Sequence, residues 1–185
     1  RKDDQEYGNS LNNLASLYTD MNNYPAAINA RRNVLDHLIK IFHRKTTDYA
    51  TTSTRLAKLY IETGDYDSAF ALLKDASIIY QAELDSNSTN NSLYAETLDQ
   101  IASLYNKQND FTNAEFYYKK AKDIKELSIG ENNPSYAESL NNLGLLATKR
   151  KNYPEAKKYL DSASDIRLHQ LGFGHPDYSE SVNNI

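Results

Sequence analysis

A tyrosine recurs at nearly constant spacing along this chain of 185 residues. The spacings are 42, 45, 42 and 42 residues, and the tyrosines that open successive units are Tyr7, Tyr49, Tyr94, Tyr136 and Tyr178. A fixed period of this length is typical of repeat proteins, in which each unit buries its apolar surface against its neighbours. The sequence therefore predicts a single array over residues 1–185, with units at 7–48, 49–93, 94–135 and 136–177 and the start of a fifth at 178–185.

Other positions of the unit agree with this register. The seventh residue after the opener is Leu or Ile, and a small residue follows it: Leu14-Ala15, Leu56-Ala57, Ile101-Ala102 and Leu143-Gly144. Tyr18, Tyr60 and Tyr105 come three residues later, and an alanine follows the turn at Ala27, Ala69, Ala114 and Ala156. Large and small residues in fixed alternation suit two close-packed antiparallel helices. Each unit is therefore predicted to be a helix pair, and the fold class all-α.

Glycines, prolines and polar turns lie at the predicted ends of the helices. Short polar turns separate the two predicted helices of each unit, and Gly64 suits the left-handed position past a helix end. All four prolines fall near predicted helix starts, and Gly130 and Gly172 close second helices. The one longer spacing is explained by a loop insertion in the polar stretch 85–91, which costs little closure entropy.

Composition narrows the class of protein. The net charge of −4 argues against a general nucleic-acid binder, and the absence of cysteine removes disulfides and thiolate sites. No apolar run approaches the roughly 18 residues that span a bilayer, so no membrane role is expected. The fifteen tyrosines are expected mainly in the core. We expect a cytoplasmic protein, and a fragment of a longer one because the chain lacks an initiator Met and stops inside a unit.

The repeat resembles the tetratricopeptide repeat, in its Leu or Ile, small residue, Tyr and post-turn Ala. The longer unit resembles the repeats of kinesin light chains, on the segments 10–18, 139–144 and 171–178. HEAT and armadillo repeats have similar periods and are the rival interpretation. The resemblance implies a right-handed α-α superhelix of antiparallel helix pairs.

The resemblance also implies a peptide-binding groove lined by the first helices. A carboxamide offers both a donor and an acceptor, so it can match a peptide unit, and Lys or Arg can bind an acidic group. The residues that the resemblance places in this groove are Asn9, Asn13, Arg55, Lys58, Gln100 and Asn142. The alternative is that these side chains form an ordinary solvated helix face.

Three functions remain open from the sequence. The first is a protein-interaction scaffold that binds an extended peptide or a partner helix. The second is a ligand-sensing or regulatory module that controls an effector domain elsewhere in a longer chain. An enzyme is the least favoured, because no catalytic motif, cofactor loop or metal-binding pattern is present.

Several smaller features have their own interpretations. His37 and His43 are six residues apart, a poor spacing for one helical face, so neither they nor His169 and His175 predict a metal site. The pair Arg31-Arg32 interrupts an apolar pattern, and the polar outer face of a capping repeat would explain it. The basic cluster of residues 149–151, 157 and 158 is expected to be a solvated surface. The truncated fifth unit, with Val182 and Ile185, is a candidate surface for self-association.

Overall fold

The computed structural model describes residues 2–42, 46–83 and 88–185, and in these ranges the chain forms nine helices and no strand. The helices divide into two compact units, unit 1 over Arg1–Asp85 and unit 2 over Ser86–Ile185. The predicted all-α fold of antiparallel helix pairs is confirmed.

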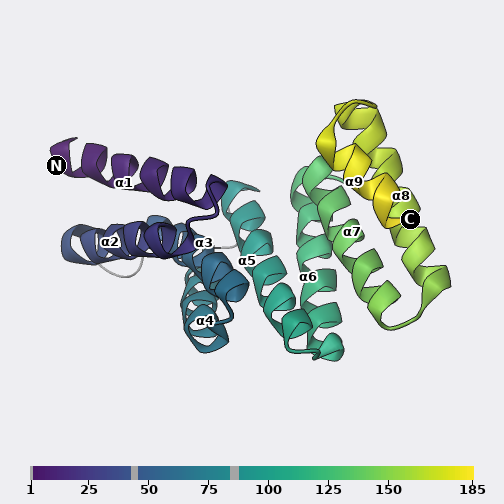
Figure 1. Cartoon of the computed structure of the whole chain (residues 1–185), viewed down its shortest axis with the longest axis horizontal. Helices are drawn as coiled ribbons and strands as arrows, with labels where there is room; N and C mark the ends of the chain where they lie inside the picture. The colour runs from purple at the N-terminus through teal and green to yellow at the C-terminus, as the bar shows by residue number, and fades with distance from the viewer. Residues whose placement is uncertain (1, 43–45, 84–87) are drawn as a thin grey trace. The chain divides into compact units, whose positions relative to one another are not determined.

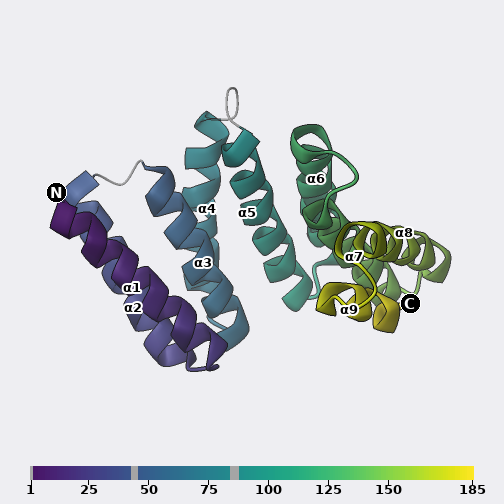
Figure 2. The ribbon, with the colours of Figure 1, turned by 90° about the horizontal axis from the view of Figure 1, so that it is seen from above.

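Unit 1 consists of two helical hairpins (Figures 1 and 2). The first pairs α1 (Lys2–Asp20) with α2 (Tyr24–Phe42), and the second pairs α3 (Thr47–Thr63) with α4 (Tyr66–Ala82). Helix α2 packs on α3, so the second helix of one pair contacts the first helix of the next.

Unit 2 repeats this plan and extends it by one helix (Figure 1). Its hairpins are α5 (Ser88–Lys107) with α6 (Phe111–Ile129) and α7 (Pro134–Lys149) with α8 (Tyr153–Leu171). Helix α9 (Pro176–Asn184) is the start of the fifth predicted unit, and it packs on α8.

The turn inside every hairpin has the same backbone geometry. Its middle residue takes a left-handed conformation, with φ of 56°, 83°, 63° and 61° at Asn22, Gly64, Asn109 and Lys151. Glycine and asparagine take this conformation at low cost, and they stand at three of the four turns. The prediction for Gly64 is confirmed. Lys151 takes the same left-handed conformation, although lysine disfavours it.

The core is built from the repeated positions. The alanines after the turns are buried, and so are the small residues of the first helices. Among the opening tyrosines, Tyr49, Tyr94 and Tyr136 are buried, which supports core packing over a surface role for these rings.

Two expectations are wrong in detail. Leu14 is 39% exposed although its equivalents Leu56, Ile101 and Leu143 are buried. Leu143 packs on Ala102, Ala114 and other residues of the preceding hairpin, whereas no hairpin of the described residues covers Leu14 in this way. The polar stretch 85–91 is not all loop, because α5 begins at Ser88; residues 84–87 lie outside the described ranges.

Candidate peptide-binding surface

The six predicted groove residues all lie on first helices. Asn9 and Asn13 lie on α1, Arg55 and Lys58 on α3, Gln100 on α5 and Asn142 on α7. The four residues of unit 1 are exposed, and Gln100 and Asn142 are half-buried. The prediction that these side chains reach the surface of their own unit is consistent with this placement, but a role in binding stays a prediction.

A pocket of unit 1 brings two of these residues together. Asn9 of α1 and Arg55 of α3 line a cavity of about 410 Å³, with Asn12, Thr51 and Thr52 among its other walls. The side of this pocket formed by α2 includes His37 and Leu38, and Asp48 lies at the start of α3. Asn13 and Lys58 are not among its lining residues. The pocket therefore offers amide, hydroxyl and guanidinium groups on one small surface.

Next to this pocket lies a buried cation that the sequence did not predict. Arg31 is only 5% exposed, so the expectation of a polar outer face at this residue is wrong. Its Nη1 donates to Asn12 Oδ1 at 3.4 Å and its Nη2 to Ser16 Oγ at 3.5 Å. Burial, and then the charge of Arg55, lower the pKa of Arg31.

Arg32 is exposed, as a polar outer face requires, and it also contacts the next hairpin. Its Nε donates to the Tyr60 hydroxyl at 2.6 Å, and its guanidinium carbon lies 5.4 Å from the centre of the Tyr60 ring. Both arginines therefore contact first helices, Arg31 that of its own hairpin and Arg32 that of the next.

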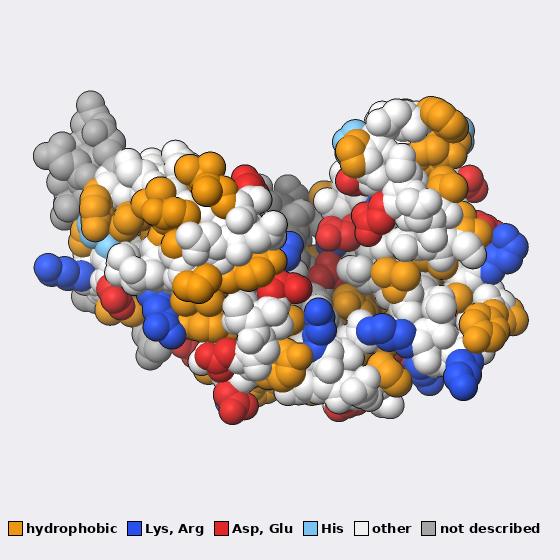
Figure 3. Space-filling view, in the orientation of Figure 1, with side chains coloured by type: hydrophobic (Ala, Val, Ile, Leu, Met, Phe, Trp, Pro, Cys, Tyr) orange, Lys and Arg blue, Asp and Glu red, His pale blue; other side chains and the backbone are white. Residues whose placement is uncertain are grey.

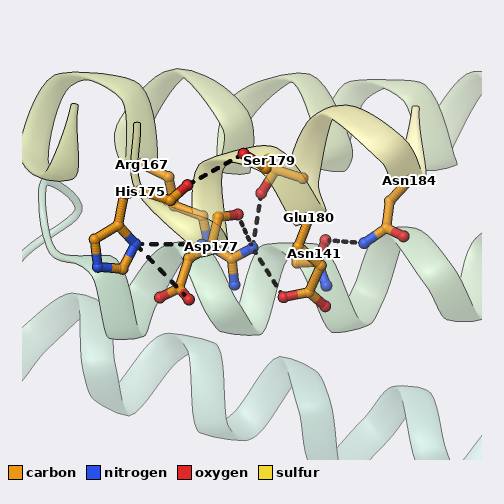
Figure 4. Close-up of polar contacts among 8 residues, drawn as sticks. Asn141, Arg167, His175, Asp177, Ser179, Glu180 and Asn184 are labelled. Atoms are coloured by element: carbon orange, nitrogen blue, oxygen red, sulfur yellow. Dashed lines mark hydrogen bonds and ion pairs between the residues drawn. The ribbon is translucent and has the colours of Figure 1, made fainter. Parts of the chain in front are cut away.

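In unit 2 the side-chain hydrogen bonds are made by Asp99 and Asn141, the residues directly before the predicted Gln100 and Asn142. Asp99 is buried and its Oδ2 accepts from Lys125 Nζ at 2.7 Å, while its neighbour Gln100 is half-buried. Asn141 is buried and its Oδ1 accepts from Asn184 Nδ2 of α9 at 3.0 Å (Figure 4). The sequence could have indicated this, because Asn12, Asp99 and Asn141 hold one position of the unit and are all polar.

Unit 2 has a polar pocket of its own, and most of its charged lining residues are acidic. It has a volume of about 260 Å³, and Glu138, Asp177 and Glu180 line it together with the buried Arg167. Glu138 and Glu180 are exposed, and Figure 3 shows acidic side chains close together on this face of unit 2, over α7 and α9. Glu180 lies 3.9 Å from Arg167 Nη1 (Figure 4). The pocket of unit 2 therefore has three carboxylates and one guanidinium among its lining residues, whereas that of unit 1 has one of each, Asp48 and Arg55.

The basic cluster of unit 2 is largely engaged within the protein. Lys149 Nζ donates to Asn106 Oδ1 at 3.0 Å, Arg150 pairs with Glu115, and Lys157 pairs with Asp161 at 2.9 Å. These contacts favour the solvated-surface interpretation of the cluster.

Two histidines of the described ranges, His37 and His175, have structural contacts. The ring of His37 meets that of Tyr7 edge to face at 5.0 Å, and His175 Nδ1 accepts from the backbone N–H of Asp177 at the start of α9. His43 lies outside the described residues. In the parts of the chain that the structure describes, no three His, Asp or Glu side chains are grouped in a way that could hold a metal ion.

None of the helices in the described ranges is both long enough and apolar enough to cross a membrane. Val182 and Ile185 are exposed on α9 and directly after it, and self-association through them stays a prediction.

The fold and its repeat define the class of protein, an α-helical repeat protein of the tetratricopeptide type. The family model for the tetratricopeptide repeat matches residues 6–82 and 93–169, which is more than half of the chain. The chain therefore belongs to the tetratricopeptide repeat family.

Solved structures agree with this fold. The chain is similar to a putative kinesin light chain of Podospora anserina with nearly identical TPR-like repeats, at 20% identity and a TM-score of 0.74, over 95% of this chain and 82% of that one. It is also similar to BtubC (BKLC) from P. vanneervenii, at 19% identity and a TM-score of 0.73, over 91% of this chain. The apo form of RapI matches at 15% identity with a TM-score of 0.71, over 92% of this chain.

This chain spans 66% of the length of BtubC and 44% of that of RapI. A comparison with curated proteins gives no match.

Proposed function

We propose that this chain is a protein-interaction scaffold whose first helices bind an extended segment of a partner protein. Membership of the tetratricopeptide repeat family supports a protein-interaction role in general, and it favours binding over catalysis. The residues proposed to contact the partner are Asn9, Asn13, Arg55 and Lys58 in unit 1 and Gln100 and Asn142 in unit 2.

The observation that carries this proposal is the pocket shared by Asn9 and Arg55. These residues lie 46 positions apart in the sequence (55−9), yet both line one cavity of about 410 Å³. The amide of Asn9 can donate to and accept from a peptide backbone, and Arg55 can bind an acidic side chain. A peptide laid across α1 and α3 would contact both.

The test begins with the selection of a ligand. A random-peptide display library is selected on the full chain, and the dissociation constant of the best peptide is measured by fluorescence anisotropy. Asn9→Ala and Arg55→Ala should weaken its binding about fivefold or more if it occupies unit 1, since hydrogen bonds to charged groups contribute about 1.5–3 kcal/mol. Gln100→Ala and Asn142→Ala test unit 2 in the same way.

Matched controls come from exposed residues of second helices. Asn29 on α2 and Gln170 on α8 are exposed amides, and Lys74 on α4 is an exposed cation. Their alanine variants should bind the peptide as the wild type does. Unchanged affinity in the alanine variants of all six proposed residues, Asn13→Ala and Lys58→Ala included, or equal losses in the controls, would remove this assignment.

A further inference from the structure

Arg31 is a buried guanidinium without a counter-charge. It is 5% exposed, and its Nε is buried with no hydrogen-bond partner. Its two side-chain bonds, at 3.4 and 3.5 Å, are long for N–H···O contacts, which usually measure 2.7–3.2 Å. Across the described ranges, no carboxylate forms an ion pair with Arg31.

The other units show that the fold does not need a cation at this position. Arg31 lies 24 residues after its opening tyrosine, and the equivalent residues are Leu73, Tyr118 and Leu160. All three are buried core residues. A buried unpaired charge is strongly unfavourable, whereas an apolar side chain of similar size is not. The first repeat therefore has a destabilising residue at a position where the other three repeats have a buried core side chain.

The one charge that is seen to act on Arg31 among the described residues is another cation, Arg55. Asn12, which accepts from Arg31, also lines the pocket of unit 1, and so does Arg55, whose charge acts on Arg31. Among the residues that the structure describes, the ionisable groups that line this pocket are Arg55, His37 and Asp48. Asp48 is exposed and is the one acidic side chain among them. Among the described residues, the guanidinium groups of Arg31 and Arg55 thus outweigh the one carboxylate of Asp48.

We propose that unit 1 contains an oxoanion site, formed by Arg31 and Arg55 with the Asn12 and Asn9 amides, and that an acidic group of the bound partner fills it. The assignment of the anion to a partner rests on the function proposed above; the site itself does not.

A carboxylate or a phosphate group fits the donors that are present. A guanidinium has five N–H donors in one plane, and two adjacent donors bind two oxygens of such a group at once. The Nε–H of Arg31 has no partner in the protein, so an oxoanion that reaches this guanidinium can accept from it. When an oxoanion enters from the pocket, the Asn12 side chain, held only by a 3.4 Å bond, can turn and donate to it through its own amide.

The test uses the full chain labelled with ¹⁵N, and two simple probes, sodium acetate and inorganic phosphate, titrated against chloride at matched ionic strength. The Nε–Hε signals of Arg31 and Arg55 are expected to shift with saturation under both probes, while that of Arg150, which pairs with Glu115 on unit 2, stays in place. The signal of Arg31 is assigned by its loss in Arg31→Leu. Absence of a saturable shift at Arg31 would overturn the site.

Two variants test which residues form the site. Arg31→Leu introduces the residue found at the same position in two other units, and Arg55→Gln introduces the equivalent Gln100 at an exposed position, so this second variant keeps the core intact. Each should weaken the affinity for phosphate and acetate at least about tenfold, as expected for losing a hydrogen bond to a charged group. Equal affinity in either variant and the wild type would contradict the assignment.

A last arm separates this site from the scaffold function. Each acidic residue of a display-selected peptide is changed to its amide, and binding is measured to wild type and to Arg31→Leu. One of these substitutions should weaken the binding of the peptide to the wild type but not to Arg31→Leu. The acidic residue changed in that peptide is then the one that fills the site. If both ions bind but no peptide residue is coupled to Arg31, the partner does not fill the site and this part of the proposal fails. If peptide binds through the six groove residues but neither ion binds, the oxoanion site fails and the scaffold function stands.

Discussion

Lys125 of α6 and Arg167 of α8 stand at the same position of consecutive repeat units, 42 residues apart (167−125), and both are buried cations. Each contacts the helix that follows its own in the chain, α7 for Lys125 and α9 for Arg167. Lys125 Nζ donates to the carbonyl of Ser135 at 3.0 Å, and Arg167 Nη1 donates to that of Asp177 at 3.0 Å. Ser135 and Asp177 both directly precede an opening tyrosine. The two cations therefore attach α7 to α6 and α9 to α8 by the same contact.

Replacing Arg167 by methionine should loosen α9. Arg167 also donates to Ser181 Oγ at 2.7 Å, so the variant removes two hydrogen bonds to a helix of only nine residues (Figure 4). Hydrogen bonds to charged groups contribute about 1.5–3 kcal/mol each, so amide exchange in α9 should accelerate at least about tenfold. Hydrogen-exchange mass spectrometry measures this. Arg150→Met, which breaks a surface pair, is the control, and unchanged exchange in α9 of Arg167→Met would contradict the role assigned to Arg167.

The stability of the chain should depend on the protonation of Asp99. Burial raises the pKa of Asp99 to about 6, although Lys125 opposes the shift. The unfolded value is about 3.9, so between pH 4 and 6 the folded protein binds the proton more tightly. The stabilisation from this group is therefore fully present below about pH 4 and is lost as the pH rises through about 6.

Asp99→Asn isolates this contribution, because the amide does not titrate. The free energy of unfolding of wild type minus that of Asp99→Asn should fall by up to about 3 kcal/mol between about pH 4 and pH 7.5. Urea unfolding of both proteins at the two pH values gives the difference. A difference that grows as the pH rises would mean that Lys125, and not burial, controls the pKa of Asp99.

Gly144→Ala should destabilise unit 2 although alanine favours helices. A Cβ on Gly144 would come within 2.6 Å of Leu160 Cγ and 2.7 Å of its Cδ2. Overpacking of this kind costs about 1–3 kcal/mol, against a gain of about 1 kcal/mol from helix propensity. Gly8→Ala is the matched control, because the nearest atom to its Cβ is His37 Cδ2 at 3.8 Å. Thermal unfolding should therefore show a lower midpoint for Gly144→Ala and no loss for Gly8→Ala.

Lys151→Asn should stabilise the turn between α7 and α8. Lys151 has a φ of 61°, and its equivalents in two other turns are Asn22 and Asn109. Asparagine takes the left-handed conformation at lower cost than lysine, so a gain of about 0.5–1 kcal/mol in the free energy of unfolding is expected. Denaturant unfolding measures it, and the reverse change Asn109→Lys should give a loss of similar size. A lower free energy of unfolding for Lys151→Asn would show that contacts of the lysine side chain stabilise the turn more than its backbone conformation destabilises it.

The sequence was sufficient to predict the helix pairs and their register. The period of 42, the small residues and the alanines after the turns predicted hairpins that the structure confirms. Gly64, Gly130 and Gly172 marked helix ends correctly because each takes a positive φ there. These features follow from the sequence because they depend on backbone geometry and on packing between neighbouring repeats, which every unit repeats.

Which polar side chains are enclosed was decided only by the tertiary structure. Neighbouring residues of a helix point about 100° apart, and the pattern alone did not distinguish Asp99 from Gln100 or Asn141 from Asn142. The packing of α6 on α5 buries Asp99 against Lys125, and α9 contacts Asn141 through Asn184. Arg31 was expected on a polar surface and is buried, because its long side chain reaches Asn12 and Ser16 of α1. The sequence by itself determined the repeat and its helices, and three-dimensional packing determined where charge is buried, since burial depends on residues distant in the chain.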